Sequence, residues 1–149
     1  MDIYEALYTT RAMRRMKPDA IPLEAQKRIL DAAIRAPHVG EGWRFILVDD
    51  PEIKARLAPL YDRAWTQMFE AFGVDRAAML AMPGQTGATA RSGDHLARHF
   101  AEAPLLLIGF GRTRDGSGIY PAIWSAMLAA RAEGIGSTLT GVMQTFVAD

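Results

Sequence analysis

The stretch LLLIGFGRTRDGSGIYPAIWSAMLAARAEGIGS, residues 105–137, decides which class of fold this sequence can adopt. Residues 105–110 are apolar on both faces, which is typical of a central strand that helices cover on both sides. The largely apolar residues 119–133 predict a helix, which Gly134 ends. The stretch therefore predicts a buried strand followed by a packed helix.

Outward from this stretch, the sequence predicts further strands and helices. Helices are expected over 2–8 and 22–35, where apolar residues follow a helical period. Strands are expected over 43–48 and 137–143, the second because it is rich in β-branched residues. The resulting order of elements predicts a three-layer α/β or α+β domain.

Another group of helices is expected between residues 50 and 101. Asp50 is the predicted N-cap and Pro51 the first residue of a helix that Pro59 should kink or interrupt. Residues 73–93 are rich in Ala, Gly, Met and small polar residues, which indicates a mobile excursion. A short helix is expected over 94–101.

Length and composition limit the function classes. The chain has 149 residues, 17 basic and 17 acidic side chains and no cysteine, and we expect one domain over 1–149. The zero net charge argues against nucleic-acid binding. The absence of cysteine excludes disulfides, thiolate zinc sites and cysteine nucleophiles. The longest apolar stretch, 119–130, is shorter than the ~20 residues of a membrane helix, so we expect a cytoplasmic protein without a membrane partner.

Two segments are candidate ligand sites. Arg11-Ala12-Met13-Arg14-Arg15 is an irregular basic segment that either binds a phosphate through its guanidinium groups or forms a solvated loop. Residues 37–44 contain two glycines before a strand, which either allow close approach to a flat ligand or simply connect helix and strand.

The remaining patterns carry weaker signals. Gly109-x-Gly111 lacks the third glycine of a dinucleotide motif, because Arg114 stands there. His95 and His99 are four residues apart but have no evident third ligand, so no metal site is expected. Ser117 is interpreted as part of a turn. Six large residues form either core, a dimer seam or a pocket lid: Trp65, Met68, Phe69, Phe72, Met79 and Met82.

Four regions, in this order, resemble the FMN-dependent nitroreductase family. They are the basic motif Thr10–Pro18, the helix end Ile29–Pro37, the strand opening Trp43–Phe45, and Ile119–Ala122 with Leu128–Ser137, which resemble the long central helix and its glycine turn. The resemblance covers nearly the whole chain apart from residues 73–94.

The resemblance implies a three-layer α+β fold with a central mixed sheet flanked by helices. It also implies a homodimer with FMN at the subunit interface. In that family NAD(P)H reduces the flavin, which then reduces a nitroaromatic, a quinone or a related small acceptor in the same site. Because the flavin carries the hydride chemistry, no catalytic side chain is expected.

The resemblance also assigns cofactor-binding positions. Arg11 and Arg14 match motif residues that hold the phosphate and ribityl chain of FMN, and Pro37 begins the loop that reaches FMN from the partner subunit. The strand end near residue 140 matches backbone that approaches the flavin ring. The expected cofactor-binding residues are Arg11, Ala12, Met13, Arg14, Pro37, His38, Thr140 and Gly141.

Departures from the family pattern keep a second hypothesis open. Thr10 and Ala12 replace an arginine and a serine of the R-R-S-x-R motif, and the loop after Pro37 is short. The sequence ends at Asp149, where the family continues with another strand and a tail. The alternative is a degenerate nitroreductase-like domain with weak or no FMN binding that serves as a dimerisation or ligand-binding module.

Overall fold

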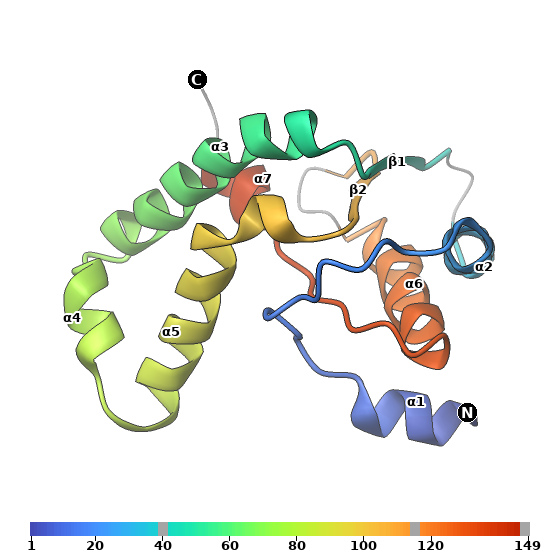
Figure 1. Ribbon diagram of the computed structural model, residues 1–149, viewed down its shortest axis with the longest axis horizontal. Coiled ribbons are helices and arrows are strands. Elements are labelled where there is room, and N and C mark those ends of the chain that lie inside the picture. The colour runs from blue at the N-terminus through green and yellow to red at the C-terminus, as the bar shows by residue number, and fades with distance from the viewer. Residues whose placement is uncertain (39–41, 114–116, 147–149) are drawn as a thin grey trace. The chain divides into compact units, whose positions relative to one another are not determined.

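The computed structural model describes residues 1–38, 42–113 and 117–146 (Figure 1). They form two compact units, each built from segments distant in sequence. Unit 1 comprises Met1–Met13, Asp19–Asp49 and Pro104–Leu139. Unit 2 comprises Arg14–Pro18, Asp50–Ala103 and the residues from Thr140 onward. That the whole chain is one domain stays a prediction.

Unit 1 combines helices with a small sheet. Its described elements are α1 (Ile3–Thr9), α2 (Leu23–Ile34), β1 (Arg44–Val48), β2 (Leu106–Phe110) and α6 (Tyr120–Ala132). The two strands are antiparallel, with Arg44 opposite Phe110 and Val48 opposite Leu106. The helices and strands predicted for these segments are confirmed, and Gly134 follows α6 with a φ of 77° as a helix-ending glycine should.

The sheet is smaller than the sequence predicts. Among the described residues, β2 pairs with β1 alone, so its expected central position is wrong for this part of the chain. The strand predicted at 137–143 is also wrong, because only Ser137 makes an isolated parallel bridge, to Ala12. The amide of Gln144 donates to the carbonyl of Gly141 at 3.0 Å, and this local bond favours a helical turn over extended pairing.

Small side chains bring α2 and α6 close together in the core of unit 1. Ala33 and Ala122 are fully buried, in a cluster that also contains Ile29 and Ala126. A Cβ at Gly109 of β2 would lie 2.8 Å from Cδ1 of an isoleucine of α6, so the absence of a side chain lets the strand approach this helix. The sheet and the two helices therefore share one core.

Unit 2 is helical in its described residues. It contains α3 (Pro51–Ala71), α4 (Arg76–Ala81), α5 (Gly84–Arg98), the 3-10 helix η1 (Phe100–Glu102) and α7 (Val142–Phe146). Asp50 caps α3 by accepting hydrogen bonds from the amides of Glu52 and Ile53, as predicted. The helix continues through Pro59, so it is not interrupted there, and the kink that was the other expected effect of this proline stays a prediction. Tyr61 and Ala64, both buried just beyond the proline, supply packing that holds the helix there.

The expected excursion over 73–93 is wrong, because these residues form α4 and most of α5. The short helix expected at 94–101 is the end of α5 followed by η1. Two glycines have packing roles: a Cβ at Gly87 would collide with the carbonyl of Met82, and one at Gly93 would lie 2.4 Å from Cη2 of Trp65. Arg91 donates to that same carbonyl of Met82 at 3.0 Å, which fastens the turn between the helices.

Candidate functional site

The predicted cofactor-binding residues fall in both units. Unit 1 holds five of them: Arg11, Ala12, Met13, Pro37 and His38. Unit 2 holds the other three: Arg14, Thr140 and Gly141.

Tyr61 connects the predicted residues of unit 2. Its hydroxyl lies 3.0 Å from Oγ1 of Thr140, and its ring stacks on Phe100 with centroids 4.4 Å apart. Burial raises the pKa of the Tyr61 phenol, and the Thr140 hydrogen bond and the charge of Arg14 counteract only part of that rise. The phenol therefore stays neutral at pH 7. It contacts Thr140 directly and feels the charge of Arg14, two residues from opposite ends of the sequence.

The backbone N–H groups of Thr140 and Gly141 are available to a ligand. Thr140 and Gly141 are exposed and precede α7. Within the described residues, their amide N–H groups donate to no protein acceptor. They are free to donate to water or to a ligand. Unit 2 thus contains the cation Arg14, the neutral phenol of Tyr61 and two free N–H donors next to the hydrogen bond of that phenol.

A cavity of about 420 Å³ lies in unit 2 and shares Arg14 with this group. Its apolar wall is formed by Trp65, Met68 and Phe69 of α3 and Met79 of α4, while α5 contributes polar and small residues. Nε1 of Trp65 is shielded from solvent and has no hydrogen-bond partner among the described residues. Four of the six large residues that the sequence left as core, seam or lid therefore line a cavity.

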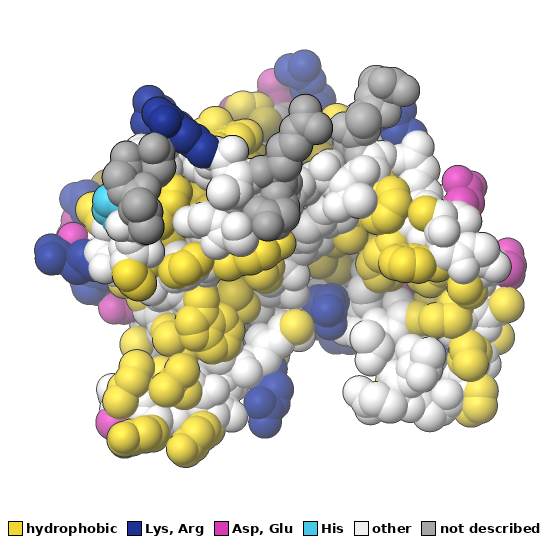
Figure 2. Space-filling model, turned by 180° about the vertical axis from the view of Figure 1, so that it is seen from behind, with side chains coloured by type: hydrophobic (Ala, Val, Ile, Leu, Met, Phe, Trp, Pro, Cys, Tyr) yellow, Lys and Arg dark blue, Asp and Glu magenta, His cyan; other side chains and the backbone are white. Residues whose placement is uncertain are grey.

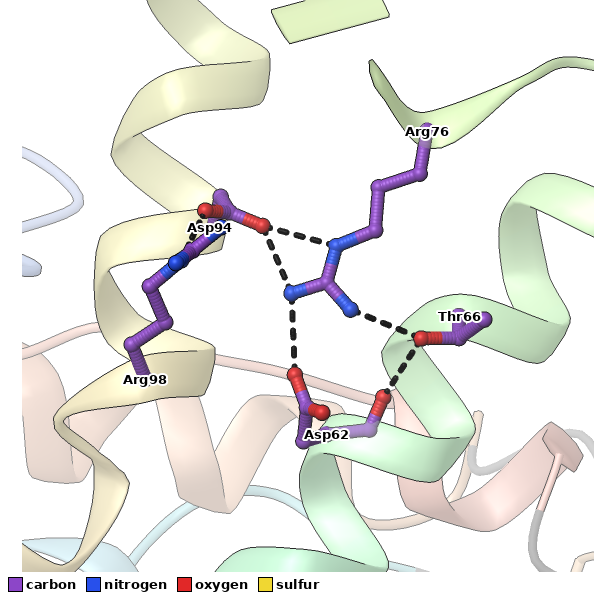
Figure 3. A network of polar contacts seen from close by, with 5 residues as sticks. All are labelled: Asp62, Thr66, Arg76, Asp94 and Arg98. Atoms are coloured by element: carbon purple, nitrogen blue, oxygen red, sulfur yellow. Dashed lines mark hydrogen bonds and ion pairs between the residues drawn. The ribbon is translucent and has the colours of Figure 1, made fainter.

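Arg76 of α4 ties the walls of this region together (Figure 3). Its Nε donates to Oδ1 of Asp94 on α5 at 2.8 Å, its Nη2 to Oδ1 of Asp62 on α3 at 2.9 Å, and its Nη1 to Oγ1 of Thr66 at 2.7 Å. Arg98 donates to the other oxygen of Asp94 at 2.6 Å. Burial would raise the pKa of Asp94, but the hydrogen bonds from Arg98 and Arg76 outweigh it and lower the pKa. One guanidinium thus joins three helices.

The basic motif in unit 1 is partly engaged. The amide of Met13 donates to the carbonyl of Ser137 at 2.9 Å, within the bridge that Ala12 forms with Ser137. Arg11 is exposed and its guanidinium donates to the carbonyl of Tyr8 at 3.2 Å. The next residue after the bridge, Thr138, has a buried hydroxyl without a partner among the described residues. The segment is therefore fixed at Met13 and has donors to spare at Arg11.

The connection between α2 and β1 begins with exposed residues. Pro37 and His38 are both exposed, and the His38 ring meets Trp43 edge-on with centroids 4.9 Å apart. Nε1 of Trp43 donates to the carbonyl of Gly118 at 3.0 Å, which fixes the indole. Residues 39–41, with one of the two glycines predicted to approach a ligand, lie outside the described residues.

His95 of α5 and His99, which follows the end of α5, contact each other with tilted rings instead of converging on further ligands. The rings of His95 and His99 are 4.2 Å apart, and Nδ1 of His99 lies 2.9 Å from Glu102. Burial lowers the pKa of His95, and the charges of Arg15 and His99 lower it further. Across the described part of the chain, no group of three potential metal ligands occurs.

Sequence reasoning missed Tyr61 and the α5 side of the cavity. Tyr61 looks like one more apolar residue in a helical pattern, and only its contact with Thr140, far along the chain, marks it. Gln85, Thr86 and Thr89 line the cavity but fell in the expected excursion. A helical reading of residues 84–98 would have placed these polar residues on one side of a helix.

Comparison with known proteins decides the family. The model of the nitroreductase family matches residues 7–148. The chain belongs to the nitroreductase family. The matched region includes every predicted cofactor-binding position, and the α+β nitroreductase-like fold predicted from the sequence is confirmed.

Individual members of the nitroreductase family are distant relatives. Protein DrgA of Synechocystis sp. is 30% identical over 64 residues, which span 41% of this chain and only 30% of that protein. Iodotyrosine deiodinase bound to FMN and 3-iodo-L-tyrosine has a TM-score of 0.68 at 22% identity, covering 97% of this chain and 79% of its own. The FMN-dependent nitroreductase NfnB from Mycobacterium smegmatis, in complex with NADPH, has a TM-score of 0.64 at 20% identity. The match covers 91% of this chain and 72% of the NfnB chain. At these identities the two structures show a shared fold.

None of the helices described for this chain is long and apolar enough to cross a membrane.

Proposed function

We propose that this chain is an FMN-dependent oxidoreductase that uses NAD(P)H to reduce a nitroaromatic, a quinone or a related small acceptor. The observation that carries the proposal is the grouping of Arg14, Tyr61 and Thr140 in unit 2. Family membership supports the reaction type, since one of the two similar solved structures contains FMN and the other, an FMN-dependent nitroreductase, contains NADPH. The proposed location is the cytoplasm.

The chemistry of this group suits a flavin. The ring system of FMN has oxygen and nitrogen acceptors along its polar edge, and the free amides of Thr140 and Gly141 offer only donors to it. When bound, FMN takes a hydride from the nicotinamide and delivers it to the acceptor. By the family resemblance, Arg11 and Arg14 would hold the phosphate and ribityl chain, with Ala12 and Met13 between them. Pro37 and His38 would belong to the partner-facing loop.

The protein's own residues then have positioning roles. Tyr61 holds Thr140 through its neutral hydroxyl and so fixes the backbone that offers the two N–H groups. Arg14 would supply a permanent positive charge to the phosphate and ribityl chain, as the family resemblance implies. No side chain in this group needs to act as an acid, a base or a nucleophile.

Exposed apolar side chains favour the proposed homodimer. Ile3, Tyr4, Leu7 and Tyr8 of α1 are all at least 39% exposed, and Figure 2 shows hydrophobic side chains gathered over this helix. A contiguous apolar face of this kind marks a protein–protein contact. Sedimentation of the wild type should give twice the monomer mass, and Tyr4→Glu should lower it, while Lys27→Glu on α2 should not.

The decisive experiment is a titration of the purified protein with FMN. We expect visible flavin absorption that follows the protein on gel filtration and NADPH consumption with a nitroaromatic acceptor. Arg14→Glu should release the flavin, whereas Arg63→Glu, a matched change at an exposed arginine of α3, should keep it. If the folded wild type binds no flavin, the proposal is wrong and the degenerate nitroreductase-like binding module is favoured. The replacement of the motif serine by Ala12 supports that alternative.

A further inference from the structure

The cavity of unit 2 has a rigid aromatic wall. Trp65 and Phe69 meet edge to face, with ring centroids 5.2 Å apart at 85°. The backbone of Gly93 packs closely against the indole, because a Cβ there would lie 2.4 Å from its Cη2 atom. A wall that is already ordered costs little entropy when a flat ring packs on it. Met68 and Met79 complete the wall with side chains that adapt to the shape of a ligand.

The charge of the cavity has one sign. Arg14 is the single charged residue among the described residues that line it, and the polar residues on α5, Gln85, Thr86 and Thr89, are neutral. Arg14 takes part in no ion pair within the described part of the chain. A guanidinium without a carboxylate partner, beside an aromatic wall, complements a flat ring that carries an anionic group.

We propose that this cavity binds the acceptor substrate and that the acceptor is a planar aromatic carboxylate; this rests on the proposed function. The volume of about 420 Å³ lies in the ~300–1,000 Å³ range of small-molecule sites. Arg14 lines the cavity and its charge also acts on Tyr61, the hydrogen-bond partner of Thr140, so an acceptor in the cavity would share Arg14 with the residues proposed to hold the flavin. Its five N–H donors suffice for both ligands.

The test compares 4-nitrobenzoate with 4-nitrobenzamide, a neutral molecule of nearly the same shape. The reaction followed is the two-electron step in which nitrobenzoate, NADPH and one proton give nitrosobenzoate, NADP⁺ and water. With the FMN-loaded protein, we expect kcat/KM to be roughly tenfold higher for the carboxylate, because a charge-assisted hydrogen bond is lost in the amide. Equal values for the two probes would overturn the proposal.

A pair of charge variants makes the test independent of Arg14. Thr89→Glu should lower the carboxylate-to-amide ratio of kcat/KM roughly fivefold, and Thr89→Lys should raise it by a similar factor. Ala88→Glu and Ala88→Lys place the same charges on an exposed α5 residue that does not line the cavity, and should leave the ratio within about twofold. If charges at positions 88 and 89 change the carboxylate-to-amide ratio by the same factor, the probes respond only to the overall electrostatic potential of the protein. That result would contradict binding of the acceptor in the cavity.

The two levels of proposal fail in different ways. If the wild type retains flavin and reduces both probes without preference, the acceptor class is wrong and the oxidoreductase proposal stands. If the wild type retains no flavin on titration, the oxidoreductase proposal fails and the acceptor role of the cavity fails with it. Flavin absorption, measured before any kinetics, separates the two results.

Discussion

The guanidinium of Arg76 meets the carboxylate of Asp94 through two nitrogens, with Nε 2.8 Å and Nη2 2.6 Å from the same oxygen. The Asp94 side chain is only 8% exposed, so the pair lies largely out of water. A carboxylate in that position depends on its cations, because the loss of one leaves a charge that water cannot fully solvate. This contact joins α4 to α5, so the stability of unit 2 should depend strongly on Arg76.

Removal of Arg76 should destabilise unit 2 more than removal of Arg98. We expect Arg76→Ala to lower the free energy of unfolding by about 2–4 kcal/mol, because it leaves three acceptors without their donor. The Arg98 side chain is 63% exposed, so Arg98→Ala should cost less than about 1 kcal/mol. Urea unfolding followed by circular dichroism measures both, and equal losses would contradict the role given to Arg76.

Acid should weaken the protein through Asp94. Its pKa in the folded state is lowered, since the hydrogen bonds from Arg98 and Arg76 outweigh the effect of burial. A lowered carboxyl pKa contributes stability that is present above the unfolded pKa of about 3.9 and is lost as the pH falls through the lower folded value. Stability measured against pH should therefore decline below about pH 4, and Asp94→Asn should flatten this decline. An unchanged slope in the variant would assign the acid sensitivity to other carboxylates.

The hydrogen bond between Tyr61 and Thr140 should appear as a coupling energy. Tyr61→Phe and Thr140→Val each remove one hydroxyl, and each should lower stability by about 1 kcal/mol. Because both remove the same bond, the double variant should lose about 1 kcal/mol less than the sum of the single losses. Tyr8→Phe, at a residue that is 70% exposed, should have no measurable effect. Additive losses at Tyr61 and Thr140 would show that the two hydroxyls act separately.

Gly93 should be intolerant of even one methyl group. In Gly93→Ala the new Cβ must displace the Trp65 ring, at an expected cost of about 1–3 kcal/mol together with a shift of the tryptophan emission. Gly141→Ala is the control, because a Cβ there meets only Oε1 of Gln144 at 3.8 Å, and in flavin-free protein it should be close to neutral. An emission spectrum of Gly93→Ala identical to the wild type would disprove the contact.

Local sequence signals predicted the elements of unit 1 and the start of α3. Asp50 and Pro51 predict the start of a helix because they are favoured at its N-cap and first position. Gly134 predicts the end of one because glycine is favoured just after the C-cap. These signals need no information from distant residues. The same holds for the apolar run over 105–110 that predicts β2.

The excursion expected over 73–93 was wrong because close packing overrides a local preference, whereas the strand expected over 137–143 was wrong because of a local turn. The glycines of α5 look like loop residues, yet Gly87 and Gly93 are there because Met82 and Trp65 occupy the space a Cβ would need. The threonines near residue 140 favour a strand, but the turn closed by Gly141 begins α7. Family resemblance led to Arg14 and Thr140, whereas Tyr61 became visible only in three dimensions.

The position of Arg76 also carries a consequence for how this sequence can change over time. Its three nitrogens are matched to acceptors on two other helices, so no single replacement at Asp62, Thr66 or Asp94 preserves the set. These four positions should therefore be inherited together or lost together. A relative that carries a different residue at position 76 is expected to have exchanged Asp94 as well, and collecting such sequences would trace when this clasp between helices arose.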